Sequence, residues 1–144
     1  MTKPSNTSDF ISEPDTSTAD QIILDNMSVS TATPELPSPL LTASGKLTNA
    51  ALVLVKITSK CGVEGHSYLF SPNAKLLPAI ASAVSVAFEE VKGRSCSPET
   101  NTDYLLDKFK LFGGTGILTM AFAAIDMASW DLLGHALGKY GHRR

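Results

Sequence analysis

The residue types most able to do chemistry gather near the carboxyl end of the chain. Asp131 and His135 are four residues apart and would share one face of a helix, and Asp126 lies nearby. Carboxylate and imidazole groups bind metal ions, but two ligands with a third at another helical angle make a weak site. The spacing therefore favours a helical pair or a buried, hydrogen-bonded carboxylate, with a metal site as the alternative.

Nucleophiles are the second class of candidate. His66 lies beside Ser67, but no Ser-His-Asp arrangement surrounds them, which favours a surface or hydrogen-bonded histidine. Cys61 and Cys96 could each be an exposed thiol, and the sequence gives no reason for either to be activated as a nucleophile. Two cysteines are too few for a disulfide framework, so we expect a reduced, cytoplasmic setting.

A glycine-rich segment at residues 112–116 (Phe-Gly-Gly-Thr-Gly) could suggest a phosphate-binding loop. It lacks the spacing of the dinucleotide fingerprint and the lysine of a P-loop, and no predicted strand precedes it. The segment is better explained as the end of one helix followed by the start of another.

Composition excludes several classes of protein. The chain has 144 residues and a formal net charge of −2, so it lacks the basic surface of a nucleic-acid-binding domain. The apolar stretch 117–138 contains Asp126 and Asp131, which are costly inside a bilayer. We therefore expect a buried helix there and neither a membrane nor a nucleic-acid partner. The length is also below the roughly 200 residues that a complete α/β barrel needs.

The amino-terminal half has the patterns of a tail and a sheet. Residues 1–20 are rich in Ser, Thr, Pro and Asp, which predicts a disordered tail. Alternating or β-branched runs predict strands at 22–33, 50–58 and 63–70. Three prolines predict a loop over residues 34–49.

The carboxyl-terminal half has the period of helices. Apolar residues recur every three or four positions from Leu77 to Val91, where Gly93 ends the pattern. A short helix is predicted over 100–112 with Thr100 and Asp103 as its N-terminal cap, and a third over 116–137 with Trp130 in the core. Strands followed by helices predict an α+β fold: a three-stranded antiparallel meander followed by a helical bundle.

Two segments carry a resemblance to a known family. The first contains Gly-His-Ser-Tyr-Leu-Phe at residues 65–70, and the second contains Ile-Asp-Met-Ala at 125–128, followed by Trp130 and Asp131. Over residues 22–139 the chain resembles the N-terminal domain of the mandelate racemase/muconate lactonizing enzyme group of the enolase superfamily. The mandelate racemase branch gives the best match. The resemblance implies a meander and helical bundle, in agreement with the pattern of the elements.

The resemblance also implies a role. In this family the domain caps an α/β barrel, which supplies the catalytic bases and binds Mg²⁺ through carboxylates. These racemases and lyases act on small α-hydroxy or sugar acids by Mg-assisted α-proton abstraction beside a carboxylate. The chain itself is thus expected to hold no catalytic residue, metal ion or cofactor. Its expected partners are the barrel, in the same or another chain, further copies of itself, and a carboxylate substrate.

Spacing within the resemblance places four substrate-capping residues in segments 34–49 and 69–73: Leu40, Ser44, Leu47 and Phe70. The alternative for each is an ordinary loop residue. Pro72 falls where mandelate racemase has a pocket tyrosine, which argues against an aromatic hydroxy acid as the substrate.

The family pattern is lost after Gly134. We therefore interpret residues 21–139 as a capping domain, with a tail at 140–144, in a truncated form without activity of its own. Two alternatives remain. The chain could be one piece of a working enzyme, or a non-catalytic interaction or oligomerisation module, which would expose apolar surface and self-associate.

Overall fold

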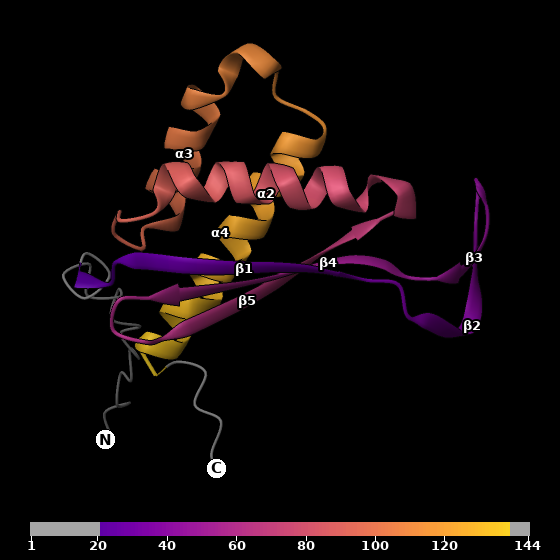
Figure 1. Cartoon of the computed structure of the whole chain (residues 1–144), viewed down its shortest axis with the longest axis horizontal. Helices are drawn as coiled ribbons and strands as arrows, with labels where there is room; N and C mark the ends of the chain where they lie inside the picture. Colours follow the sequence, from indigo (N-terminus) through magenta and orange to yellow (C-terminus); the bar gives the residue numbers. More distant parts are fainter. Residues whose placement is uncertain (1–20, 139–144) are drawn as a thin grey trace, which may run out of the picture.

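The computed structural model describes residues 21–138, so the predicted tails at 1–20 and 140–144 lie outside the described residues (Figure 1). Strands come first in the chain and helices follow, which confirms the predicted α+β order. The elements are β1 (Leu24–Ala32), β2 (Glu35–Thr42), β3 (Gly45–Asn49), β4 (Ala51–Ser59), β5 (Glu64–Ser71), η1 (Ala74–Leu76), α2 (Leu77–Val91), α3 (Pro98–Lys108), η2 (Lys110–Phe112) and α4 (Ile117–Ala136).

The main sheet is the predicted antiparallel meander. Its strand order is β1-β4-β5, with β4 in the centre. In β4 every second residue from Ala51 to Ser59 is buried, because alternate side chains point to opposite faces of a strand. The register places Val29, Val55 and Ser67 side by side across the three strands.

The predicted loop over residues 34–49 is wrong: this segment forms a second sheet, the β2–β3 hairpin. The prolines at 37 and 39 are tolerated because both strands of a two-stranded sheet are edges, and the pairing is irregular between Glu35 and Leu40. The turn is closed by the Thr42 hydroxyl, which donates to the Gly45 carbonyl at 2.8 Å, and Gly45 has a φ of 128°. We call this hairpin the arm, since it projects from one end of the main sheet (Figure 1).

The helices cover one face of the main sheet, and the core lies between the two layers (Figure 1). The predicted apolar face of α2 is confirmed, with Leu77, Ile80, Val84, Phe88 and Val91 all buried. α4 lies against β5 and α2, and α3 lies against α4. Within residues 21–138, α4 is the one helix long and apolar enough to span a membrane, and 50% of its apolar window is buried inside the fold.

The second helix differs from its predicted form at both ends. It begins at Pro98, whose fixed φ suits the first helical turn, with Ser97 as the N-cap residue. Thr100 and Asp103 therefore lie inside the helix, and the predicted cap at these residues is wrong. The helix ends at Lys108, and the chain continues as η2 to Phe112, which is exposed.

The predicted core position of Trp130 is also wrong. Its side chain is 48% exposed, on the face of α4 turned away from the core. The glycine-rich segment does what its composition predicts: η2 ends at Phe112, Gly113 and Gly116 have positive φ, and α4 begins at Ile117.

Candidate functional site

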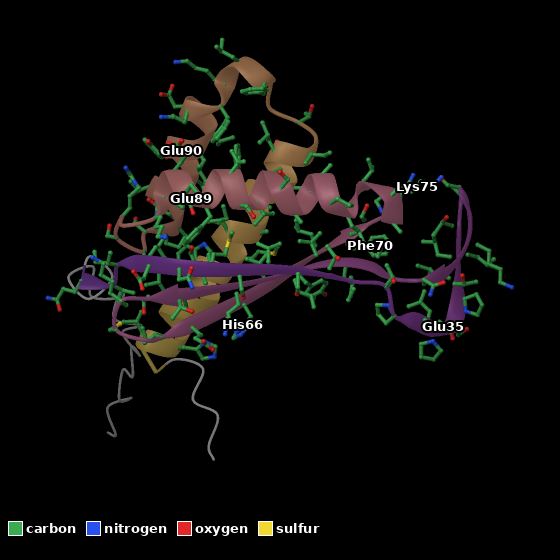
Figure 2. The ribbon with its side chains drawn as sticks, in the orientation of Figure 1. Glu35, His66, Phe70, Lys75, Glu89 and Glu90 are labelled. Atoms are coloured by element: carbon green, nitrogen blue, oxygen red, sulfur yellow. The ribbon has the colours of Figure 1, made fainter. Side chains whose placement is uncertain are left out.

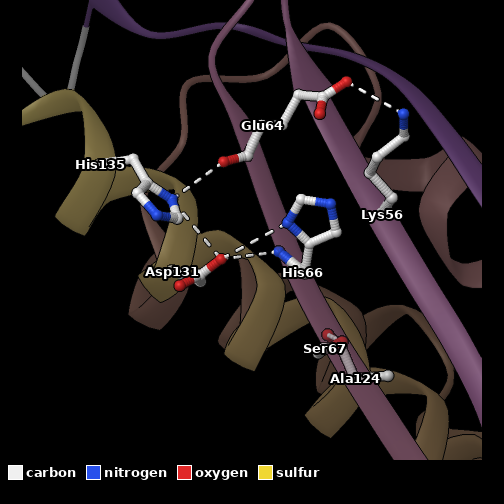
Figure 3. Close-up of polar contacts among 7 residues, drawn as sticks. All are labelled: Lys56, Glu64, His66, Ser67, Ala124, Asp131 and His135. Carbon is white, nitrogen blue, oxygen red and sulfur yellow. Dashed lines mark hydrogen bonds and ion pairs between the residues drawn. The ribbon is translucent and has the colours of Figure 1, made fainter. Parts of the chain in front are cut away.

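The last strand and the last helix meet in a polar cluster formed by His66, Asp131 and His135 (Figure 3). Asp131 Oδ2 accepts the main-chain N–H of His66 at 2.8 Å and lies 3.8 Å from His66 Nδ1. The same oxygen lies 3.6 Å from His135 Nδ1, one helical turn further along α4. His135 Nδ1 in turn donates to the Glu64 carbonyl at 3.1 Å. The predicted helical pair of Asp131 and His135 is confirmed.

This cluster closes the edge of the main sheet. β5 is an edge strand, and its outward N–H and C=O groups at residues 66 and 64 receive side-chain partners from α4. Ser67 adds a third contact, since its hydroxyl donates to the Ala124 carbonyl at 2.6 Å (Figure 3). A carboxylate partner for His66 could not be predicted, because Asp131 lies 65 residues away and no local signal links them.

The cluster does not have the geometry of a metal centre. Within residues 21–138, no group of three or more His, Cys, Asp or Glu side chains could hold a metal ion. Asp126, the third candidate ligand, accepts a hydrogen bond from Thr102 at 3.1 Å instead of joining Asp131. The oxygen donors that Mg²⁺ requires are therefore not assembled in the described part of the chain.

The two cysteines lie in different environments. Cys61 is exposed in the β4–β5 turn, and a hydrogen bond from Ser59, whose Oγ lies 3.2 Å from its sulfur, lowers the pKa of its thiol. Cys96 is fully buried, so the expectation that it could be an exposed thiol is wrong. Burial raises the pKa of the Cys96 thiol to about 11.

Three of the four substrate-capping candidates lie on the arm. Leu40 on β2 is paired with Leu47 on β3, and Ser44 is in the turn between them. Leu40 is exposed and Leu47 half-buried, and Leu41 beside them is 80% exposed. The arm therefore presents leucine side chains to solvent at one end of the molecule.

The fourth candidate, Phe70, lies on the uncovered face of the main sheet, 43% exposed. Figure 2 shows Phe70 and Lys75 toward the end of the molecule that carries the arm, with His66 further along β5. One end of this face is apolar, because the register places Leu54 beside Tyr68 and Leu52 beside Phe70. The other end is charged, and there Lys56 Nζ forms an ion pair with Glu64 Oε1 at 3.0 Å. An open groove of about 360 Å³ lies on this face between Ser28, Lys56 and Tyr68.

A second open groove of about 350 Å³ lies where the arm joins the main sheet. Its walls are the strand β3 and the turn that leads from β5 into η1. Leu47 is the one substrate-capping candidate that lines it. Of the other lining residues only Pro72 was a candidate by its place in the sequence, because the residues converge only once the arm has formed. The lining residues are Thr33, Lys46, Leu47, Thr48, Asn49, Ala51, Ser71, Pro72 and Ala74.

The helical layer also exposes apolar side chains. Met127 and Trp130 lie three residues apart on α4, with exposed fractions of 43% and 48%. Leu111 and Phe112 in η2 are 95% and 74% exposed. The helical layer therefore leaves apolar side chains exposed at two places, one on α4 and one in η2.

Comparison with known proteins identifies the family to which this fold belongs. Residues 26–139 match the family described as the mandelate racemase/muconate lactonizing enzyme N-terminal domain. The chain belongs to this family. The predicted resemblance is thereby confirmed, and the meander and three long helices are the fold of a capping domain.

Solved structures with the same fold include an enolase from Bradyrhizobium complexed with magnesium and mandelic acid. It is 31% identical with a TM-score of 0.76, and the match covers 81% of this chain and 32% of that one. An enolase from an alpha proteobacterium (BAL199) with bound magnesium is 22% identical, with a TM-score of 0.74 and coverage of 80% and 32%. L-Talarate dehydratase from Polaromonas sp. JS666, complexed with magnesium and L-glucarate, is 22% identical, with a TM-score of 0.71 and coverage of 81% and 33%. The chain thus spans about a third of the length of these proteins.

Proposed function

We propose that this chain is the substrate-capping domain of a mandelate racemase-like enzyme. The enzyme would act on α-hydroxy or sugar acids by Mg²⁺-assisted abstraction of the α-proton. The observation that carries the proposal is the family match over residues 26–139, joined to an arm that presents apolar and polar side chains at one end of the fold. The catalytic bases and the carboxylates for Mg²⁺ would come from a barrel domain, and residues 21–138 would have no activity by themselves.

The substrate would be enclosed by the arm and the end of β5. Leu40, Leu47 and Phe70 would contribute apolar contacts, and the Ser44 hydroxyl would lie at the tip of the arm. Substrate pockets are largely apolar with a few placed polar groups, and this mixture of side chains fits that pattern. Pro72 in place of an aromatic residue favours a sugar acid over an aryl hydroxy acid.

Docking to the barrel would use the apolar side chains left exposed by the fold. Met127 and Trp130 on α4 form the exposed strip on the longest helix. Covering them would remove apolar area from water at about 25 cal/mol per Å². We propose this strip, with the leucines of the arm, as the surface that meets the barrel, in the same or another chain.

A chimera tests the proposed function. Residues 21–138 would replace the matching third of the Bradyrhizobium enolase, and deuterium incorporation at the α-carbon of a panel of hydroxy acids would be followed by NMR with and without Mg²⁺. We expect exchange by the chimera and none by the 144-residue chain alone. Exchange catalysed by the chain alone would contradict the proposal that the catalytic groups come from a barrel domain. A folded chimera that exchanges no acid, although the parent enzyme does, would contradict the capping role.

A second candidate function is a non-catalytic interaction or oligomerisation module. The 95% exposure of Leu111 and the 74% exposure of Phe112 favour it, because these side chains lie outside the arm and could join copies of the chain. Light scattering of the purified chain over a range of concentrations separates the two. Concentration-dependent association that Leu111→Ser abolishes would support the module, and a monomer throughout would argue against it.

We also propose a cytoplasmic location. Support comes from the two free cysteines, of which Cys61 is exposed and would be open to oxidation in a secreted protein.

A further inference from the structure

β1 is the second edge strand of the main sheet, on the side opposite β5 (Figure 1). At its start the Leu24 N–H donates to the Arg94 carbonyl at 3.0 Å, and the Gly93 N–H donates to the Leu24 carbonyl at 2.8 Å. Beyond this point, within the described part of the chain, the main-chain groups of residues 26–32 pair with β4 and with no other segment. The outer side of β1 is therefore an open row of N–H and C=O groups.

The sequence of this row lacks the features that protect an edge strand. The edge of β5 is covered by Asp131 and His135, and β2 carries two prolines. Residues 26–32 read Asn-Met-Ser-Val-Ser-Thr-Ala, without a proline, a lysine or any other charged side chain. The irregularity in the pairing of β1 comes before this run, between Leu24 and Asn26. An edge of this kind is suited to the addition of a further strand.

The core is also incomplete beneath β1. On β4 the core-facing side chains of Val53 and Ile57 are fully buried. Their neighbours on β1 are Thr31, which is exposed, and Met27, which is half-buried, and Val29 between them is also half-buried. A further strand beside β1, with its own helical layer, would remove these side chains from water.

We propose that the edge of β1 binds the same edge of a second copy of this chain, as an antiparallel pair about a two-fold axis at Val29. Val29 is the middle residue of 26–32, so this register pairs every residue of the open row. Opposite residues of an antiparallel pair point to the same face, so the helices of both copies would lie on one side. Two three-stranded sheets would thereby join into one continuous sheet.

The open row is complementary to itself in this register. On the uncovered face, Ser28 of one copy would face Ser30 of the other, where hydroxyl groups can exchange hydrogen bonds. On the helical face, Val29 would meet Val29. Asp25, the nearest charged residue, would face Thr33 and not a second aspartate. No like charges oppose each other, and the same surface serves both copies, as a two-fold interface requires.

A pair of double variants tests this register, because Ser28 and Ser30 are exposed and lie beside Lys56 and Leu54 of β4. Ser28→Glu with Ser30→Glu would place two carboxylates opposite each other wherever position 28 meets position 30. The dissociation constant of the dimer should rise by at least about tenfold. Ser28→Glu with Ser30→Lys would place opposite charges there, and the dissociation constant should stay within about threefold of the parent value or fall.

Light scattering of the 144-residue chain over a range of concentrations measures the dissociation constants, and circular dichroism checks that both variants are folded. A parent chain that stays monomeric at every concentration would overturn the proposal. An equal change of the dissociation constant in the two folded variants would also overturn it, because the register requires them to differ.

Hydrogen exchange locates the contact. The amides of residues 26–32 should exchange more slowly as the chain concentration rises, while those of β5, residues 64–71, should not respond and provide the internal reference. Slow exchange at residues 26–32 that does not depend on concentration would mean that a segment of the same chain covers this edge, and would overturn the proposal.

This inference goes beyond the proposed capping function and can fail separately from it. An inactive chimera would remove the capping role and leave dimerisation through β1 intact. A monomeric chain would remove the β1 contact and leave an active chimera explained. Association that Leu111→Ser abolishes, but that Ser28→Glu with Ser30→Glu leaves unchanged, would assign the contact to η2 and overturn the proposal.

Discussion

Asp131 on α4 accepts the main-chain N–H of His66 on β5 at 2.8 Å, a contact between residues 65 positions apart in the sequence. It joins the last helix to the edge of the main sheet at the point where the strand has no neighbouring strand. Without such a partner, the edge would offer unpaired main-chain groups to another chain. The contact therefore both stabilises the fold and protects its edge.

Replacing Asp131 by Ala should lower the free energy of unfolding by about 1–2 kcal/mol, since the His66 N–H loses its charged acceptor. Asp131→Asn keeps an oxygen acceptor and should cost less than half as much. Urea unfolding followed by circular dichroism measures both. Equal losses in the two variants would mean that charge on the carboxylate, and not the acceptor, supplies the stability.

Gly65 should tolerate no side chain. A Cβ at this position would lie 2.6 Å from Leu132 Cβ and still closer to the Ala128 carbonyl oxygen, so β5 and α4 would have to separate. Gly65→Ala should therefore destabilise the domain by about 3 kcal/mol or more.

Gly114→Ala is the matched control for Gly65→Ala, because a Cβ at Gly114 meets no atom within 4 Å. Its effect should stay within about 0.5 kcal/mol. Thermal unfolding of both variants checks the pair. A Gly65→Ala protein as stable as the control would contradict the close approach of α4 to β5.

Two serines on facing elements should respond in opposite ways to removal of their hydroxyl group. The Ser129 hydroxyl is buried and finds no hydrogen-bond partner among residues 21–138, so Ser129→Ala should be neutral or stabilise the domain by up to about 1 kcal/mol. The Ser67 hydroxyl donates to the Ala124 carbonyl at 2.6 Å, so Ser67→Ala should cost about 1 kcal/mol. The denaturant midpoint of Ser67→Ala should lie below that of the parent protein. The midpoint of Ser129→Ala should equal or exceed that of the parent. A lower midpoint for Ser129→Ala would indicate a partner for its hydroxyl.

The two thiols should differ in their reaction with an alkylating reagent. Cys61 is exposed, and hydrogen bonding lowers the pKa of its thiol below the ordinary value of 9.0, so its rate should reach half-maximum below pH 9.0. Ser59→Ala removes the main donor and should move this midpoint to higher pH. Cys96, with its pKa raised to about 11, should react only after unfolding. Mass spectrometry of the labelled native protein checks the site, and rapid labelling of Cys96 would contradict its burial.

The strands and the long helices follow from periodicity, because one face of each is buried. Every second residue of β4 and the predicted face of α2 face the core, and both elements were predicted within one or two residues. The arm was missed because prolines argue against a central strand, while a two-stranded sheet has no central strand. Trp130 was misplaced because α4 is apolar on nearly every face, so its sequence does not say which face is inward.

The site is less predictable than the fold. The groove at the base of the arm combines residues of two segments, 33–51 and 71–74, whose proximity depends on an unpredicted hairpin. Lys46 and Asn49 are of types common on any protein surface, so their place in the lining of a groove could not be predicted from the residues themselves. The contact of His66 with Asp131 likewise needs the register of α4 along β5, which no local pattern encodes.

The proposed capping role requires contact with a barrel domain, and Trp130 reports directly on the strip of α4 proposed to make it. It is the only tryptophan in the chain, so 5-fluorotryptophan labelling gives a single ¹⁹F signal from that strip. The labelled chain would be titrated with the separately produced barrel of the Bradyrhizobium enolase. We expect a saturable shift of this signal, weakened by Met127→Ser. An unchanged ¹⁹F signal at saturating barrel, with the chain still folded, would contradict the capping role.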